Sequence, residues 1–73
     1  MTTYRYTERD EETGGILWDV TGSSLDEMAE KIGMDIEDAT NLWAGVLPGS
    51  PVIDRDMSGK DGITYSREFH CDA

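Results

Sequence analysis

The sequence predicts an α+β fold in which an antiparallel sheet, made of two β-hairpins, packs on a two-helix hairpin in the order ββ-αα-ββ. Both ends of the chain alternate apolar and polar residues, as half-buried strands do. The stretch between them, residues 24–46 (SLDEMAEKIGMDIEDATNLWAGV), repeats apolar residues every three or four positions, as amphipathic helices do. With 73 residues, the chain is expected to form a single small domain, 1–73.

The first hairpin is expected to consist of strands at residues 2–9 (TTYRYTER) and 16–21 (ILWDVT), because both segments alternate. Residues 10–15 (DEETGG) are polar and end in two glycines, which is typical of the turn between paired strands. The side chains predicted to share the buried face of this hairpin are Tyr4, Tyr6, Ile16, Trp18 and Val20.

Two short helices are predicted to meet at a tight corner. Ser24 and Glu27 form the pattern of a capping box, in which the Ser oxygen accepts a helix-start N–H and the Glu reaches back. Gly33 can adopt the left-handed conformation that ends a helix, and Asp35 opens the next one, which stops before Pro48. The residues predicted to form the buried stripes are Leu25, Met28, Ala29, Ile32, Ile36, Ala39, Leu42, Trp43 and Val46.

The second hairpin is expected from strands at residues 52–57 and 63–70, joined by a polar turn at 58–62. The connector before it, residues 47–51 (LPGSP), contains two prolines that exclude a helix there. Residues 71–73 are expected to be frayed. The side chains predicted to face the core are Ile63, Tyr65 and Phe69.

The charge of the chain is one-sided, with sixteen acidic residues against six basic ones and a net charge of −10. Direct binding to nucleic acid or to anionic membranes is not expected, because both require clustered Lys and Arg. The charge suits a cationic protein partner, high solubility or a salty environment. A lone cysteine allows no internal disulfide, and no apolar run reaches the length of a membrane span or signal peptide, so we expect a cytoplasmic protein. The oligomeric state stays open.

The acidic residues fall into two predicted groups, one at the tip of the first hairpin and one on the outward faces of the helices. Acidic residues near a helix start are favoured by the helix dipole and keep a small protein soluble, which is the simpler interpretation. The functional interpretation is mimicry of nucleic acid by a charged surface that binds a protein partner. The candidate partner-binding residues are Asp10, Glu11 and Glu12 at the tip and Asp26, Glu27, Glu30, Glu37 and Asp38 on the helices.

The helical segment resembles the helix-turn-helix of DNA-binding regulators, because Ala29 and Gly33 stand four residues apart among apolar positions. In that family the second helix enters the major groove and its flanks bind phosphates. Here no Lys or Arg occurs between Lys31 and Arg55, and the second helix is acidic. We therefore expect a structural corner or, as an alternative, a regulator that acts through protein contacts. The surrounding apolar positions are Met28, Ile32, Met34, Ala39 and Leu42.

Residues 54–69 (DRDMSGKDGITYSREF) resemble an EF-hand calcium loop, with oxygen-bearing residues at Asp54, Asp56 and Ser58. The chain departs from that pattern, because Glu68 lies three places beyond the twelfth position and two prolines precede the loop where an entering helix belongs. The alternatives are a polar hairpin turn or a small calcium-binding domain that uses these three residues as metal ligands.

Residues for catalysis are scarce. His70 is the only histidine and lies beside Cys71 near the end of the chain, where neither a pocket nor an orienting group is expected. We therefore expect no enzymatic activity and no cofactor. Trp18, Trp43 and Tyr65 are interpreted as core aromatics, and any of them left exposed would be an anchor for a partner.

In its size, its acidity and its lack of catalytic residues, the chain resembles the small phage-encoded inhibitors of bacterial defence, such as anti-restriction and anti-CRISPR proteins. The resemblance is one of kind and covers no motif. It implies a viral inhibitor in the host cytoplasm that binds a cationic, nucleic-acid-handling protein and blocks its groove. The two acidic groups would then make the contact.

Overall fold

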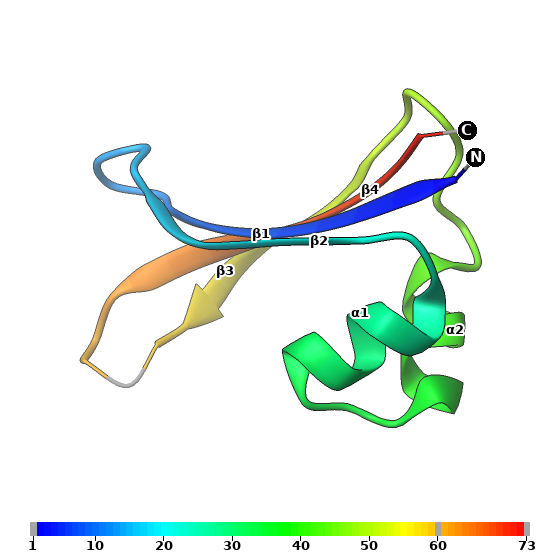
Figure 1. Ribbon diagram of the computed structural model, residues 1–73. Helices are drawn as coiled ribbons and strands as arrows, with labels where there is room; N and C mark the ends of the chain where they lie inside the picture. The colour runs from blue at the N-terminus through cyan, green and yellow to red at the C-terminus, as the bar shows by residue number, and fades with distance from the viewer. Residues whose placement is uncertain (1, 60, 73) are drawn as a thin grey trace.

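A computed structural model describes residues 2–59 and 61–72 of the chain. The predicted order ββ-αα-ββ is confirmed, and the four strands form an antiparallel sheet in the order β2-β1-β4-β3 (Figure 1). The two strands that begin and end the described chain therefore lie side by side in the middle of the sheet. The elements are β1 (Thr3–Asp10), β2 (Ile16–Gly22), α1 (Leu25–Ile32), α2 (Ile36–Trp43), β3 (Val52–Ser58) and β4 (Thr64–Asp72).

The strand register sorts the side chains onto two faces. Tyr6 of β1 lies opposite Val20 of β2 on one side and Phe69 of β4 on the other. These three residues therefore share the face that packs on the helices. Their neighbours one position along the chain, such as Thr7, lie on the opposite face, which we call the open face.

The core lies between the helices and one end of the sheet. Trp43 of α2 packs edge-on against Phe69 and Tyr4, with ring centroids 5.1 Å and 6.2 Å away. Its indole N–H donates a hydrogen bond of 3.1 Å to the carbonyl of His70, so the buried polar group is satisfied. The prediction of a buried Trp43 is confirmed. The buried core residues are Tyr6, Met28, Ala29, Ala39, Trp43, Val46 and Phe69.

The helix boundaries follow the local signals in the sequence. The Ser24 oxygen accepts the backbone N–H of Glu27 at 3.1 Å, as predicted. The Glu27 carboxylate reaches Ser23 rather than Ser24, so the capping box is only half formed. Gly33 adopts φ 87°, and its N–H donates to the carbonyl of Ala29, which ends α1 in the expected way. Within residues 2–59 and 61–72, neither helix has the length and apolar character that a membrane crossing needs.

The helices cover only one half of the sheet. Each helix has eight residues and is about 12 Å long, whereas the eight residues of β1 span about 27 Å. In Figure 1 the helices lie beneath the end of the sheet that holds both chain termini, and the two hairpin turns extend away from them. We call strand residues 8–19, 54–59 and 61–68, with their turns, the distal half, and the rest the proximal half.

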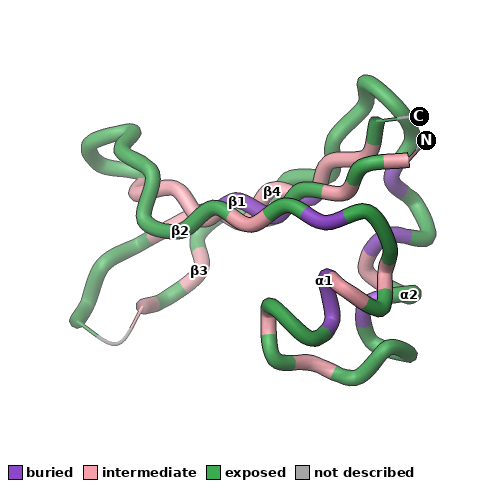
Figure 2. The backbone as a smooth tube through the Cα atoms, viewed as in Figure 1, coloured by how far each residue is buried: buried purple, intermediate pink, exposed green. Residues whose placement is uncertain are grey.

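This partial cover corrects several core predictions. Ile16 and Trp18 of β2 are exposed, Ile63 before β4 is exposed, and Tyr65 is only half-buried, because no helix reaches the distal half. Figure 2 shows the buried segments gathered near the helices and the hairpin turns exposed. Ile36, which was also predicted to be buried, is exposed as the first residue of α2, next to the interhelical corner.

The end of the chain is more ordered than predicted. Cys71 and Asp72 belong to β4 and pair with Tyr4 and Thr3 of the neighbouring strand. The expectation of a frayed tail was therefore wrong for these two residues, because the central strand β1 supplies a full-length partner. Ala73 lies outside the described residues.

Candidate functional site

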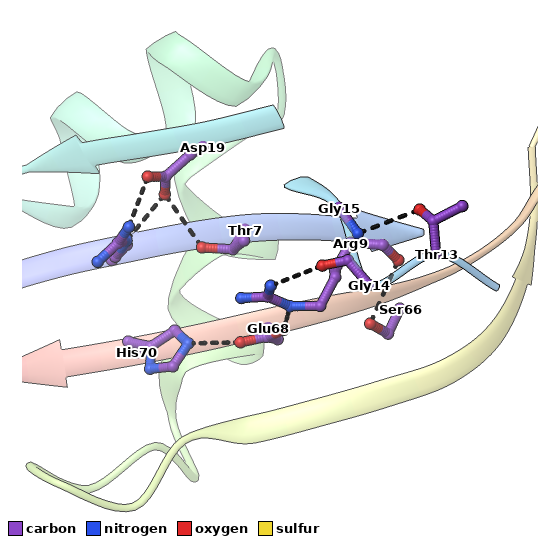
Figure 3. A network of polar contacts seen from close by, with 10 residues as sticks. Thr7, Arg9, Thr13, Gly14, Gly15, Asp19, Ser66, Glu68 and His70 are labelled. Carbon is purple, nitrogen blue, oxygen red and sulfur yellow. Dashed lines mark hydrogen bonds and ion pairs between the residues drawn. The ribbon is translucent and has the colours of Figure 1, made fainter. Parts of the chain in front are cut away.

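The open face of the sheet carries a network of ion pairs between β1, β2 and β4 (Figure 3). Arg5 donates two hydrogen bonds to Asp19, of 2.8 Å from Nε and 2.6 Å from Nη2. Thr7 donates a third bond of 3.0 Å to the same carboxylate. The pKa of Asp19 is lowered, chiefly by the bond from Arg5. This carboxylate is therefore held ionised by its own sheet.

A second part of the network lies on β1 and β4. Arg9 donates from Nε to Glu68 at 2.9 Å, and His70 Nε2 lies 3.1 Å from the other oxygen of the same carboxylate. The Glu68 side chain is only 13% exposed. Burial raises its pKa, but the hydrogen bonds from Arg9 and His70 outweigh that effect and the net pKa is lowered. Figure 3 shows Arg9 also reaching the carbonyl of Gly14 in the hairpin turn.

The other face of the distal half is also held by polar contacts. The hydroxyl of Tyr6 donates to Glu8 at 2.7 Å, and burial together with this bond raises the pKa of the phenol. Arg67 donates to Asp54 at 3.0 Å, and its guanidinium lies 5.5 Å from the ring centre of Phe69. Polar contacts within β1 and between β3 and β4 therefore take the place that apolar packing has under the helices.

Most of the described basic side chains form ion pairs with acidic side chains of the same chain. Arg5, Arg9 and Arg67 each pair with a carboxylate on a neighbouring strand. Lys31 of α1 pairs with Glu27 at 3.0 Å, which lowers the pKa of that carboxyl. The positive charge of the chain is therefore largely neutralised by neighbouring carboxylates. The remaining carboxylates determine the electrostatic potential around the protein.

The hairpin tip uses two of its three acidic residues to hold its own structure. The Asp10 carboxylate accepts the backbone N–H groups of Glu12 and Thr13, at 2.8 Å and 3.3 Å, in an Asx turn. The Glu11 carboxylate accepts the N–H of Asp56 from β3 at 3.0 Å. Glu12 is exposed, and its carboxylate has no hydrogen bond or ion pair with another described residue.

The helices present most of the unpaired carboxylates. Glu27 is engaged by Ser23 and Lys31. Four other acidic side chains on the helices are exposed, and within residues 2–59 and 61–72 none of their carboxylates has a hydrogen-bond or ion-pair partner. These four are Asp26, Glu30, Glu37 and Asp38.

The structure does not join the two predicted acidic groups into one surface. The chain measures 35 × 24 × 17 Å along its principal axes. Figure 1 places the tip at residues 10–15 at one end of the sheet and the helices under the other end. The helix pair and the tip are therefore two separate acidic regions.

The residues of the calcium alternative lie on a strand rather than in a curved loop. Asp54 is engaged by Arg67, Asp56 adopts φ 60° at a register shift in β3, and Ser58 pairs with Thr64. Among the described residues, no group of three or more His, Cys, Asp or Glu side chains is arranged to hold a metal ion. The three predicted ligands are not brought together as an EF-hand loop would bring them.

No pocket is found in the part of the chain that the structure describes. The side chain of His70 contacts Glu68 on the open face, and Cys71 packs against the edge of the core. The two neighbours lie on opposite faces of β4, since successive strand residues alternate. They therefore form no Cys–His pair.

The sequence reasoning missed two features of this surface. The ion-pair network could have been found from the alternation of Arg5, Thr7 and Arg9 in the first strand, which places their side chains on one face. The exposure of Trp18 had no local signal, because an amphipathic strand looks the same whether or not a helix covers it.

Comparison with known proteins identifies no relative of this chain. No protein-family model, curated protein or solved structure matches the chain. Its function has to be inferred from its own side chains, chiefly the unpaired carboxylates of the helices and the exposed edge at β2.

Proposed function

We propose that the protein is a small acidic inhibitor that binds a cationic, nucleic-acid-handling protein and blocks its nucleic-acid groove. In this role it would act as a nucleic-acid mimic, as an anti-defence protein of a phage would, in the manner of anti-CRISPR proteins. The helix pair makes the main contact through Asp26, Glu30, Glu37 and Asp38, and the hairpin tip adds to the long-range field.

The observation that supports this proposal is the segregation of charge. Four basic residues are paired with carboxylates of the chain itself. Residues 24–43 contain six acidic residues and a single Lys, which Glu27 neutralises. A cation on a partner therefore meets unpaired carboxylates on the helices with few competing cations nearby.

The charge density of the helix pair is comparable with that of a duplex. Each helix is about 12 Å long, and about 12 Å of double-stranded DNA carries roughly seven phosphate charges. The two helices carry five carboxylates over a similar length, four of them without a partner among the described residues, and Asp35 adds a sixth just before α2. A groove that binds phosphates would therefore meet a comparable number of negative charges on the helix pair.

Salt adaptation is the simpler account of an acidic surface, and it makes a different prediction. An acidic surface that serves solvation predicts stability that rises with salt and no specific partner. A mimic predicts electrostatically steered binding, whose association rate falls steeply with salt.

The experiment is a competition assay with purified nucleic-acid-handling proteins, including restriction and CRISPR effector complexes. A labelled duplex is bound to each effector, and its release by the acidic protein is followed by fluorescence anisotropy. We expect release from at least one effector, and surface plasmon resonance across a salt series should then show an association rate that falls as salt increases.

Charge reversal provides a matched pair of variants. Glu37→Lys on α2 and Glu12→Lys on the tip make the same charge change at exposed, unpaired positions at opposite ends of the molecule. Binding should weaken more in Glu37→Lys, and further in the double variant with Asp38→Lys, through repulsion at the contact. An association rate that does not change with salt, or one that is unchanged in the double variant, would contradict mimicry. Equal effects of both single variants would contradict a contact centred on the helices.

A further inference from the structure

The edge strand β2 exposes a continuous apolar segment. Ile16, Leu17 and Trp18 are 52%, 47% and 40% exposed. Because β2 lies at the edge of the sheet, alternate backbone N–H and C=O groups along it lack a strand partner. Natural proteins usually protect such an edge with Lys, Pro or a bulge, and β2 contains no Lys, Arg or Pro.

The opposite edge, β3, is protected in these ways. Pro51 precedes it, and three charged residues in succession, residues 54–56, lie in its middle. Its register shifts between Asp54 and Met57, where Asp56 adopts φ 60°. A strand could not add to β3 in regular register. β2 also has a register shift, between Ile16 and Trp18, but it lacks the proline and the run of charged residues, so β3 is the better protected edge.

The open part of the β2 edge is short and well defined. Its own register shift lies opposite Glu8 and Arg9, and the pairing is regular from Trp18 to Gly22. At the helix end, the Lys31 ammonium donates to the carbonyl of Thr21 at 2.7 Å and occupies that end of the edge. Residues 16–20 remain accessible.

We propose that residues 16–20 of β2 dock an extended basic segment of the partner protein, which adds to the sheet as a fifth strand. This proposal rests on the proposed function, since it names how the cationic partner is held. Backbone hydrogen bonds along β2 supply the pairing, and the side chains of the added strand lie beside those of β2 on each face.

Charge complementarity favours a basic occupant on both faces. On the helix-side face, a Lys or Arg beside Trp18 can lie over the indole ring, and Glu8 is the next residue across the sheet. On the open face, the neighbouring position lies beside Asp19, whose side chain is 31% exposed although it is paired with Arg5. Beyond the start of β2, the exposed carboxylate of Glu12 adds to the negative field.

A second copy of this chain is a poor occupant of the same edge. Each copy carries a net charge of −10. An antiparallel pairing of β2 with itself, centred on residues 16–20, brings the two Asp19 side chains close to each other, and like charges across a strand pair are destabilising. A basic segment would replace this repulsion with attraction and could still contact the apolar side chains of β2.

Trp18 is the anchor of this docking site. Its ring packs edge-on against Tyr6, with centroids 5.7 Å apart and an interplanar angle of 79°. The indole is therefore held in place before a partner arrives, and binding orders few additional side chains. Pre-positioned aromatic residues are the usual energetic centre of a protein interface.

The test selects ligands from a library of random 12-residue peptides with the immobilised full-length protein. We expect enriched peptides to be basic, with apolar residues at alternate positions. In titrations followed by amide NMR, the largest shifts should fall on residues 16–20. N-methylation of alternate peptide nitrogens should weaken binding in one register only, because just one set of N–H groups faces β2.

Two variants measure the role of the anchor. Trp18→Ala should weaken the selected peptides by about tenfold or more. Ile53→Ala is the matched control, since Ile53 is also 40% exposed but lies on β3, and it should leave affinity unchanged. Amide spectra of both variants confirm that each is folded.

Several outcomes would overturn the docking site. These are a selection that yields no peptide dependent on Trp18, enriched peptides without basic residues, amide shifts centred on the helices, or equal losses in both variants. A dimer seen by sedimentation equilibrium and lost in Trp18→Ala would assign the edge to a second copy instead.

The same variants separate this proposal from the proposed function. If the partner protein binds Trp18→Ala as tightly as the wild type but loses the Glu37→Lys, Asp38→Lys double variant, mimicry stands and the docking site fails. If binding is lost in Trp18→Ala and kept in the double variant, the docking site stands and mimicry by the helices fails.

Discussion

The two tryptophans show how differently the two halves of the sheet are held together. Trp43 lies in the proximal half, between Phe69 and Tyr4, and is buried with its N–H satisfied. Trp18 lies on the same face of the sheet in the distal half, where it contacts Tyr6 and remains 40% exposed. Among the described residues, all the buried core side chains belong to the proximal half or the helices.

One short sheet can therefore be stabilised in two different ways. Under the helices, apolar side chains are removed from water, which is the dominant favourable contribution to folding. In the distal half, Ser66 is the only described residue that is buried. Polar pairs such as Arg9 with Glu68 and Arg67 with Asp54 tie the strands together there. The distal half should therefore respond to pH, whereas the proximal half should respond to changes in volume.

The largest expected effect comes from removing the proximal anchor. Trp43→Ala deletes a buried indole and its hydrogen bond to His70, and truncations of this kind cost about 3–5 kcal/mol. That is a large part of the stability of a small domain, so we predict that the variant is unfolded or nearly so at room temperature. Amide NMR gives the answer, with Trp43→Phe as a control that keeps an aromatic ring. A well-dispersed spectrum of Trp43→Ala would remove this residue from the core.

The next largest effect is expected from acid. The pKa values of Asp19 and Glu68 are lowered in the folded state, so their contribution is fully present above the unfolded-state values of about 4. It is lost as pH falls through the folded-state values, because the unfolded chain then binds more protons.

Hydrogen exchange and thermal unfolding check this prediction. Between pH 7 and about 5 the two carboxylates should change stability little, and below pH 4 stability should fall, with distal amides losing protection before proximal ones. Asp19→Asn with Glu68→Gln should be less stable at pH 7 and show a shallower fall in acid. Simultaneous loss of protection in both halves would show that the sheet does not divide as described.

A smaller effect on stability is expected from Trp18→Ala. The indole contacts Tyr6 but stays 40% exposed, and substitutions at such positions change stability by about 1 kcal/mol or less. Urea unfolding of this variant beside Trp43→Ala measures the contrast directly. A loss as large as that of Trp43→Ala would mean that the distal half belongs to the core after all.

The smallest effect is expected from calcium. Asp54 is engaged by Arg67, and Asp56 and Ser58 lie along a strand, so we predict no binding or only the weak affinity of about 10⁻⁴–10⁻³ M typical of poor sites. Amide NMR with and without calcium tests this, with Asp54→Ala as the control. Micromolar affinity that is lost in Asp54→Ala would show that the distal turn rearranges around a metal ion.

Local chemistry along the chain determined the elements of this protein. The alternation in the strands, the Ser24 cap and Gly33 at the end of α1 each predict a structure that depends on neighbours within a few residues. The ββ-αα-ββ order and the buried position of Trp43 could be predicted from these signals. The unpaired acidic residues of the helices could be identified as candidates for the same reason, since helical periodicity places them opposite the apolar stripe.

Which residues these elements cover depends on contacts between distant parts of the chain. The position of β1 and β4 in the centre of the sheet orders Cys71 and Asp72 and leaves β2 at an edge. Strand order depends on pairing between residues far apart in the chain, which local periodicity does not record. Two helices of about 12 Å cannot cover strands of about 27 Å. Because the helices pack on the proximal end of the sheet, Trp43 is buried while Trp18 stays partly exposed.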